Sequence, residues 1–214
     1  AIAGVFQVDS GTITIDGQDV TKLPEHKRAA FLGRVFQDPM MGTAPTMQIE
    51  ENLALAARRG QPRGLKWGIT ALERADYREL LKTLDLGLED RLTAKVGLLS
   101  GGQRQALTLL MAFLKQPKLL LLDEHTAALD PKTADKVLAL SDQIVQENNL
   151  TTLMITHNMK DAIAHGNRLI MMDAGRVVVD ISGEDKKKLT VPDLLALFSR
   201  ASGSDEANDK MLLS

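Results

Sequence analysis

Hydrophobic and polar residues follow two different periods along this chain, and the change comes at about residue 46. Before that point, residues 12–15 alternate between turn glycines, which predicts a half-buried antiparallel strand near a sheet edge. Residues 29–36 are mostly apolar and predict a second strand that ends at Gln37. Residues 1–4 indicate the last turn of a helix, with Gly4 as its left-handed cap.

The pattern then becomes helical. Residues 49–58 and 77–86 place apolar side chains at i, i+3 and i+4, which predicts two amphipathic helices within a helical subdomain over residues 46–98. Glycines and a proline interrupt the pattern between the two helices. This interruption carries a basic cluster, which predicts a solvated surface loop or a contact with a protein or a lipid headgroup. The cluster consists of Arg58, Arg59, Arg63 and Lys66.

Apolar runs alternate with helices in the following part. Residues 119–122 are all leucine and residues 152–156 are nearly as apolar, as is typical of parallel strands covered on both faces. Asp130 as N-cap and Pro131 at the first helical position predict a surface helix over residues 130–149. Strands that alternate with helices predict an α/β fold with a largely parallel sheet. The face of this helix that we expect to be buried contains Ala134, Val137, Leu138, Ser141, Ile144 and Val145.

The C-terminal part has weaker patterns. Residues 158–165 predict a short helix, and residues 168–181 predict a hairpin that turns at Ala174 and Gly175. Residues 199–210 are polar and small, so we expect them to be disordered.

Composition narrows the function classes. Apolar residues make up 44% of the chain and charged residues 25%, and the net charge of −2 provides no general basic field for nucleic acid. Without cysteine there is no disulfide or thiolate metal site, and the 4 histidines lack metal-ligand spacing. No apolar run approaches the roughly 20 residues of a membrane span. The chain starts without methionine or a targeting peptide, so we expect a shortened start.

Three predicted strands are followed by polar residues with complementary chemistry. Gln37 follows the first, Asp123 and Glu124 follow the second, and His157 follows the third. Because ligands of α/β folds bind at the carboxyl ends of parallel strands, we expect these side chains to converge. Asp123 suits Mg²⁺ and Glu124 suits the activation of water, while Gln37 can hold the metal or that water. His157 can donate to charge that develops on a γ-phosphate. Each residue alone also fits a structural role.

A serine and two glycines form a second candidate site. Ser100 is expected to cap a helix that begins near Gln103, and the N–H groups at such a helix end attract anions. Gly101 and Gly102 lower helix stability, but they let an anion approach the backbone. The phosphate-binding pattern GxxxxGK[ST] does not occur in these 214 residues. The polar residues expected to be exposed on this helix are Gln103, Arg104 and Gln105.

These motifs resemble those of the nucleotide-binding subunits of ABC transporters. The matching stretches are LSGGQRQAL at residues 99–107, LLLLDEHTAALD at residues 119–130 and THN at residues 156–158. The similarity covers residues 1–181. In chain order the matched elements are the glutamine loop at Gln37, the signature at Ser100, Gly101, Gly102 and Gln103, the Walker B acids Asp123 and Glu124, the D-loop ending at Asp130, and the switch histidine His157.

The resemblance implies a P-loop NTPase-type ABC ATPase domain, α/β, with a mostly parallel sheet, antiparallel edge strands and an inserted helical subdomain. Its N-terminal strands and P-loop are expected to be absent. The implied segments are a partial ATPase core with the glutamine loop (residues 1–45), the helical subdomain (46–98), the ATPase core with signature, Walker B, D-loop and switch histidine (99–183), and a C-terminal helix with a disordered tail (184–214).

In such ATPases two subunits pair head to tail and enclose ATP. The signature residues and Asp130 would contact the partner's nucleotide, and Asp123 with Gln37 would hold Mg²⁺. Glu124 would be the general base, and His157 would sense the γ-phosphate. The implied partners are a second ATP-binding subunit, transmembrane permease subunits and an extracellular or periplasmic solute-binding protein, with no nucleic acid. The implied location is the cytoplasmic face of the cell membrane. The sequence around these motifs most resembles that of bacterial uptake systems for amino acids.

Two departures from the family pattern matter. Without a P-loop, we expect these 214 residues alone neither to bind ATP tightly nor to hydrolyse it. His125 stands where most members have proline, directly after the predicted base, and is either a tolerated local variant or an influence on Glu124.

Other classes share part of the pattern. DNA-repair and chromosome-maintenance ATPases carry the signature, but they insert long coiled coils or zinc modules, and this chain has no cysteine and no sustained heptads. Translation-factor relatives carry two cassettes. A non-catalytic, truncated module is the third alternative, although a scaffold has no need for Glu124 and His157. The residues upstream of Ala1 would discriminate among these classes.

Overall fold

The computed structural model describes residues 1–61 and 68–202. The chain forms two compact units, Ala1–Met154 and Ile155–Ser214, each of which is described by itself. These units, called the first and the second unit below, do not test the four segment boundaries expected from the sequence, which stay a prediction.

The first unit is built on a sheet of three strands in the order β3-β4-β5. Strand β3 (Leu32–Val35) runs parallel to β4 (Leu119–Asp123), and β5 (Thr152–Ile155) lies on the other side of β4. This arrangement confirms the predicted α/β class with parallel strands. Strand β3 is shorter than the predicted 29–36, because a helical turn and the loop after it precede Leu32.

The N-terminal part contains short elements. Strands β1 (Thr14–Ile15) and β2 (Gln18–Asp19) pair antiparallel, which confirms the predicted antiparallel strand but shortens it from residues 12–15 to two residues. Gly4 has a φ of 85°, as predicted, and its N–H lies 2.9 Å from the carbonyl oxygen of Ala1. The residues before Gly4 form a turn rather than the predicted end of a helix.

A buried arginine holds this part together. Helix α1 (Glu25–Arg28), which the sequence pattern did not predict, ends at Arg28, whose side chain is almost fully buried. Its guanidinium donates to backbone carbonyls, whose dipoles offset the cost of burying the charge. The acceptors are the carbonyl oxygens of Ala1, Ile2, Thr21 and Leu23, at 2.8 to 2.9 Å.

Two helices form the region that was expected to be helical. Helix α2 (Ile49–Ala57) confirms the first prediction. Helix α3 (Ala71–Lys82) begins six residues before the predicted start at residue 77, because Thr70 and Glu73 form a capping box. It ends before residue 86, and Asp85 beyond it has a φ of 51°.

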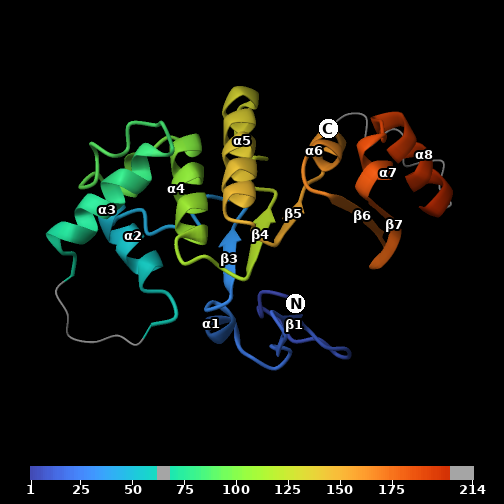
Figure 1. Cartoon of the computed structure of the whole chain (residues 1–214), viewed down its shortest axis with the longest axis horizontal. Helices are drawn as coiled ribbons and strands as arrows, with labels where there is room; N and C mark the ends of the chain where they lie inside the picture. The colour runs from blue at the N-terminus through green and yellow to red at the C-terminus, as the bar shows by residue number, and fades with distance from the viewer. Residues whose placement is uncertain (62–67, 203–214) are drawn as a thin grey trace. The chain divides into compact units, whose positions relative to one another are not determined.

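These helices share one core with α4 (Gly101–Phe113), and Figure 1 shows α2, α3 and α4 side by side. Loop residues, among them the 3₁₀ turn Val96–Leu98, complete this core. Helix α4 also packs on β3, and α5 (Pro131–Glu147) packs on α4. The core residues with no exposed surface are Ile49, Leu53, Leu81, Leu88, Val96, Leu107 and Leu110.

Helix α5 confirms its sequence pattern. Asp130 caps it by accepting from the N–H of Thr133 at 3.2 Å, and Pro131 is its first residue. Val137, Leu138, Ser141 and Ile144 are buried, as predicted, while Ala134 and Val145 are half-buried. The apolar face of α5 therefore packs toward the sheet, where Ile144 lies in one hydrophobic cluster with Leu120 and Leu122 of β4.

The basic cluster is only in part a surface loop. Arg58 forms an ion pair with Glu73 at 2.8 Å, and Arg59 donates to the carbonyl oxygen of Ala112 at 3.0 Å. Burial lowers the pKa of Arg59 from its ordinary value. Both side chains thus tie α2 to its neighbours, whereas Arg63 and Lys66 lie outside the described residues.

The second unit combines a hairpin with short helices. Strands β6 (Arg168–Asp173) and β7 (Arg176–Ser182) pair antiparallel, and positive φ angles of 45° and 79° at Ala174 and Gly175 confirm the predicted turn. Helix α8 (Val191–Ser202) corrects the prediction that disorder begins at residue 199, while residues 203–214 lie outside the described part. The other two helices are α6 (Met159–Ala164) and α7 (Gly183–Lys187).

The helices that the structure describes do not include a candidate for crossing a bilayer. Within residues 1–61 and 68–202, no helix combines the length and the apolar character that a membrane span requires.

Candidate functional site

The carboxyl ends of β3 and β4 meet at one edge of the sheet. Val35 lies opposite Leu122 in the parallel register, so Gln37 and the pair Asp123 and Glu124 follow neighbouring strand ends. Gln37 is exposed, and both acids are half-buried. The structure therefore brings these three predicted site residues to the same edge, while their chemical roles stay predictions.

An arginine that the sequence reasoning missed lies at this edge. Arg34 Nη2 is 3.7 Å from Asp123 Oδ2, and the Arg34 guanidinium carbon lies 4.3 Å from the centre of the Phe36 ring. The Asp123 side chain is 41% exposed, so this ion pair is a weak one that water screens. Its signal in the sequence is a single cation inside the apolar run of residues 31–36.

The donor set at Asp123 constrains the kind of metal site that it can form. Across the described parts of the chain, no group of three or more His, Cys, Asp or Glu side chains is placed to hold a metal ion. Mg²⁺ in nucleotide sites usually takes one or two protein oxygens and fills its other positions with phosphates and water. Asp123 with Gln37 therefore fits a nucleotide-held Mg²⁺ and not an all-protein cage.

Glu124 has an unusual backbone. Its φ is 43°, in the left-handed region, which costs an L-residue about 1–2 kcal/mol. The carbonyl of Glu124 accepts from the N–H of Ala127 at 3.0 Å, so a tight turn follows the strand at once. Such strain persists only where the surroundings impose it, and it often marks a functional position.

The predicted signature segment, residues 100–103, forms a capped helix end. Ser100 Oγ accepts from the N–H of Gln103, and Gln103 Oε1 accepts from the N–H of Ser100, both at 3.2 Å. This capping box starts α4 at Gly101, two residues before the predicted start. The first N–H groups of a helix have no acceptor within it, so the end of α4 suits an anion.

The two glycines have different structural reasons. Gly102 is buried, and a Cβ at this position would overlap Cγ2 of Thr133 in the first turn of α5. Gly101 is exposed, and a Cβ there would meet only Leu129 Cδ2, at 3.5 Å. Close packing of α4 on α5 therefore requires Gly102, whereas no such contact explains Gly101, which remains the position suited to anion approach.

We expect Gly102→Ala to destabilise the protein by about 1–2 kcal/mol, since overpacking against Thr133 exceeds the gain in helix propensity. Urea unfolding measures this change. Gly101→Ala is the matched control and is expected to be neutral or to stabilise by up to about 1 kcal/mol. Adding Thr133→Ser to Gly102→Ala removes the overlapping methyl group and should restore most of the loss. A destabilised Gly101→Ala with an unchanged Gly102→Ala would contradict this assignment.

Gln105 is not exposed on α4, contrary to what the sequence had suggested. It was expected to be exposed, but it has no exposed surface, because it lies on the face of α4 that packs toward β3. Its Nε2 donates to the carbonyl oxygen of Phe36 at 3.3 Å, next to Gln37. Helix α4, which carries the predicted signature, is therefore joined by a buried side chain to the residue before the predicted glutamine-loop residue Gln37. Gln103 and Arg104 are half-buried.

Asp130 lies at the start of α5. Hydrogen bonds from Thr133, from its side chain first and then from its backbone, hold the pKa of Asp130 below its ordinary value. Since Thr133 also packs against Gly102, the predicted D-loop end and the signature helix are in contact through one residue.

The predicted switch histidine belongs to the second unit. His157 is exposed and follows β5 by two residues. Asn158 next to it caps α6, with Oδ1 accepting from the N–H groups of Lys160 and Asp161. The convergence of His157 with the acids of the first unit stays a prediction.

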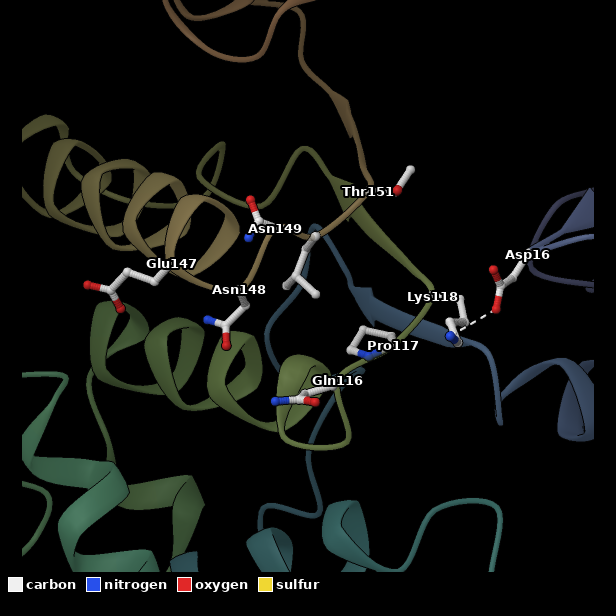
Figure 2. Close-up of a pocket in the computed structure, with 9 residues that line it drawn as sticks. Asp16, Gln116, Pro117, Lys118, Glu147, Asn148, Asn149 and Thr151 are labelled. Carbon is white, nitrogen blue, oxygen red and sulfur yellow. Dashed lines mark ion pairs between the residues drawn. The ribbon is translucent and has the colours of Figure 1, made fainter.

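A surface pocket lies elsewhere in the first unit. Residues 116–118, residues 147–151 and Asp16 line it, and Figure 2 shows the ion pair between Lys118 and Asp16 at its rim. These loops precede β4 and β5, so the pocket lies at the end of β4 opposite to Asp123. It is thus separate from the predicted site.

Comparison with known proteins assigns the family. The model of the ABC transporter family matches residues 1–127, which is more than half of the chain. The chain belongs to the ABC transporter family. This ABC chain is 48% identical over 200 residues to the tyrosine transport ATP-binding protein of Clostridioides difficile, covering 94% of its own length and 79% of that relative.

More distant relatives and structures agree with the family assignment. The ABC chain is 38% identical over 179 residues to the methionine import ATP-binding protein of Rhizobium etli, covering 82% of its own length. It spans only 46% of that relative. The crystal structure of the ADP conformation of an ATP-binding cassette of an ABC transporter matches with a TM-score of 0.71 at 23% identity, over 92% of this chain and 80% of that one. This likeness supports the cassette fold.

Proposed function

We propose that this ABC chain is part of the ATP-hydrolysing subunit of a bacterial importer for amino acids. The observation that carries the proposal is the arrangement in the first unit. Asp123 and Glu124 end β4 beside Gln37, and the capped end of α4 presents Gly101. The relatives named for tyrosine transport and methionine import support an amino acid as the solute.

Each residue has a distinct part in the proposed reaction. When bound, Mg²⁺ would neutralise charge on the phosphates of ATP. Asp123 and Gln37 would contribute oxygen ligands to that ion, and Glu124 would orient the attacking water and accept its proton. His157 donates a hydrogen bond to the charge that develops on the γ-phosphate. The strained backbone at Glu124 supports this role, since preorganised groups are often held that way.

The N-terminal end of α4 would serve a nucleotide carried by a second subunit. There, Ser100, Gly101 and Gln103 would surround the γ-phosphate, and the uncovered backbone at Gly101 supports such an approach. Asp130 would couple this contact to the chain's own site, because Thr133 touches both the Asp130 carboxylate and Gly102. Gly102 in this view positions α4 and contributes its N–H.

The remaining partners follow from the same proposal. The complex would contain two ATP-binding subunits, permease subunits in the membrane and an external solute-binding protein. The chain would act at the cytoplasmic face of the membrane, without nucleic acid. The transport relatives favour this view over a DNA-repair ATPase, and the presence of both Glu124 and His157 favours it over a non-catalytic module.

Reconstitution of the intact subunit with its permease subunits in proteoliposomes tests the proposed function. ATP-dependent uptake of labelled tyrosine or methionine is the expected result. Spermidine is the matched control solute, because another relative is named as a spermidine and putrescine import ATP-binding protein. Uptake of spermidine with no amino-acid uptake would overturn the solute class, and absence of ATP hydrolysis by the complex would overturn the proposal itself.

We also propose that residues 1–214 alone neither bind ATP tightly nor hydrolyse it, since GxxxxGK[ST] does not occur among them. Isothermal calorimetry of the 214-residue chain with ATP and Mg²⁺ measures this directly, and micromolar binding would refute it.

Mixed with an intact subunit, the chain is expected to complete one composite site. Ser100→Arg should abolish that gain in ATP turnover, because a bulky cation would fill the anion position.

A further inference from the structure

A buried histidine lies directly after the proposed base. His125 is 2% exposed, and its Nε2 lies 2.9 Å from Oγ of Ser141 in α5. Ser141 is also buried, at 3% exposed, and its hydroxyl donates to the carbonyl oxygen of Val137 at 2.8 Å. The two side chains therefore link the end of β4 to the middle of α5, across a separation of 16 residues.

The direction of this hydrogen bond follows from the chemistry of the hydroxyl group. A serine hydroxyl has one proton, and Oγ of Ser141 lies within hydrogen-bond distance of both the carbonyl oxygen of Val137 and Nε2 of His125. We assign the ring proton of His125 to Nε2, because in this tautomer the hydroxyl donates to Val137 and accepts from His125, which satisfies both bonds at once. A proline at position 125 would have no such donor. The sequence left open whether histidine at this position, where most family members have proline, has any effect. In the structure, the histidine adds a hydrogen bond that proline could not make.

This bond acts next to a strained residue. Glu124 has a positive φ, with the β4 ladder ending at Asp123 on one side of it and the anchored His125 on the other. The anchor itself is rigid, because Ile144 of α5 packs in one cluster with Leu120 and Leu122 of β4. The strand and the helix are thus held together both by apolar packing and by one buried polar bond.

We propose that His125 is a positioning residue for Glu124. Through its bond to Ser141, it holds the backbone of Glu124 in the left-handed conformation and so fixes the direction of the Glu124 carboxylate. This inference rests on the proposed ATPase function, because it assigns His125 a part in that reaction. His125 itself need not touch nucleotide or water.

The test uses variants of both partners in the intact subunit, assayed for ATP hydrolysis with its permease. His125→Leu removes the donor, and Ser141→Ala removes the acceptor. We expect each to lower kcat about tenfold with little change in KM for ATP, since a small misplacement of a catalytic group lowers the rate of the chemical step. The double variant should be no slower than His125→Leu alone, because both changes break one bond.

Two controls separate positioning from stability. His125→Gln places an amide N–H near the position of Nε2 and should recover most of the wild-type kcat, whereas His125→Asn, which is too short, should not. Ile144→Val destabilises the same helix without touching the bond and is expected to lower Tm but not kcat.

A spectroscopic measurement tests the bond without any catalysis. The protein contains 4 histidines, so ¹⁵N-histidine labelling gives few ring signals to assign. We expect the His125 ring to carry its proton on Nε2 and the Nε2 signal to shift in Ser141→Ala. A proton on Nδ1 alone would overturn the inference.

The kinetic outcomes distinguish the two levels of the proposal. If Glu124→Gln leaves the rate of ATP hydrolysis unchanged, the proposed role of Glu124 is wrong, whereas absence of hydrolysis by the wild-type complex would overturn the proposed function itself. If Glu124→Gln abolishes hydrolysis while His125→Leu and Ser141→Ala keep the wild-type kcat, the positioning role of His125 is wrong and the function stands. Equal losses in His125→Leu and His125→Gln would also count against the bond.

Discussion

Glu124→Gln in the intact subunit is expected to lower kcat for ATP hydrolysis by about 10²–10⁴-fold while ATP binding persists. Glutamine has the size of glutamate and can adopt the same backbone, but its amide cannot accept a proton from water. The position makes this loss specific: Glu124 directly follows β4, next to Asp123 and at the same edge as Gln37. Single-turnover kinetics and nucleotide binding on the same preparation measure the two effects.

A matched control for this substitution lies on α5. Glu147 is exposed at the end of that helix and accepts a hydrogen bond from Gln143, so Glu147→Gln makes the same chemical change far from the proposed site. We expect it to keep the wild-type kcat. A Glu124→Gln protein that hydrolyses ATP within about twofold of wild type would show that another group activates the water.

Arg74→Met is expected to give the largest loss of stability among the charge substitutions considered, with a Tm lower by roughly 5 °C or more. Arg74 donates to both oxygens of Glu50, at 2.6 and 2.8 Å, and joins α3 to α2. The Glu50 side chain is only 5% exposed, whereas that of Arg74 is 44% exposed. Removing the arginine therefore leaves a buried carboxylate without its main partner.

The pH dependence of this loss identifies its cause. In the wild type, hydrogen bonding to Arg74 holds the pKa of Glu50 below its ordinary value of 4.5, against the opposing effect of burial. The pair therefore stabilises the fold above that value, and this contribution is lost as the pH falls through the lowered pKa. In Arg74→Met, burial dominates and raises the pKa of Glu50. Protonation of Glu50 at low pH therefore restores part of the stability that the variant loses.

The difference in Tm between wild type and Arg74→Met should consequently be largest near pH 7 and narrow from about pH 5 downward. Differential scanning calorimetry over this range measures it. Lys82→Met, which removes an exposed ion pair with Glu79 on the same helix, is the control and should show little change at any pH. If the difference in Tm between wild type and Arg74→Met stays constant with pH, lost packing and not the Glu50 charge causes the loss of stability.

The division between Gly101 and Gly102 changes how the signature is understood. As sequence, the two glycines look equivalent, and both were expected to admit an anion. In the structure, Gly102 is required by the contact between α4 and α5, while Gly101 faces outward. Substitutions at Gly102 should therefore lower the stability of the fold, whereas substitutions at Gly101 should weaken nucleotide binding at the composite site.

The sequence by itself determined those features that depend on neighbours a few residues apart. The N-caps at Ser100 and Asp130, the turn at Ala174 and Gly175, and the apolar face of α5 were all predicted. Each depends on hydrogen bonds or side-chain periods within about four residues, which the order of residues specifies directly. The motif order also led to the ABC family, which the comparisons then confirmed.

Only the tertiary structure decided which polar residues are buried and what they contact. Gln105 was expected to be exposed but bonds to Phe36, Arg34 lies beside Asp123, and His125 is hydrogen-bonded to Ser141. These partners are separated by 16 residues or more, so no local period reveals them. They meet because β3 pairs with β4 and because α4 and α5 pack on one another and on the sheet, and this packing is a property of the assembled first unit rather than of any single segment.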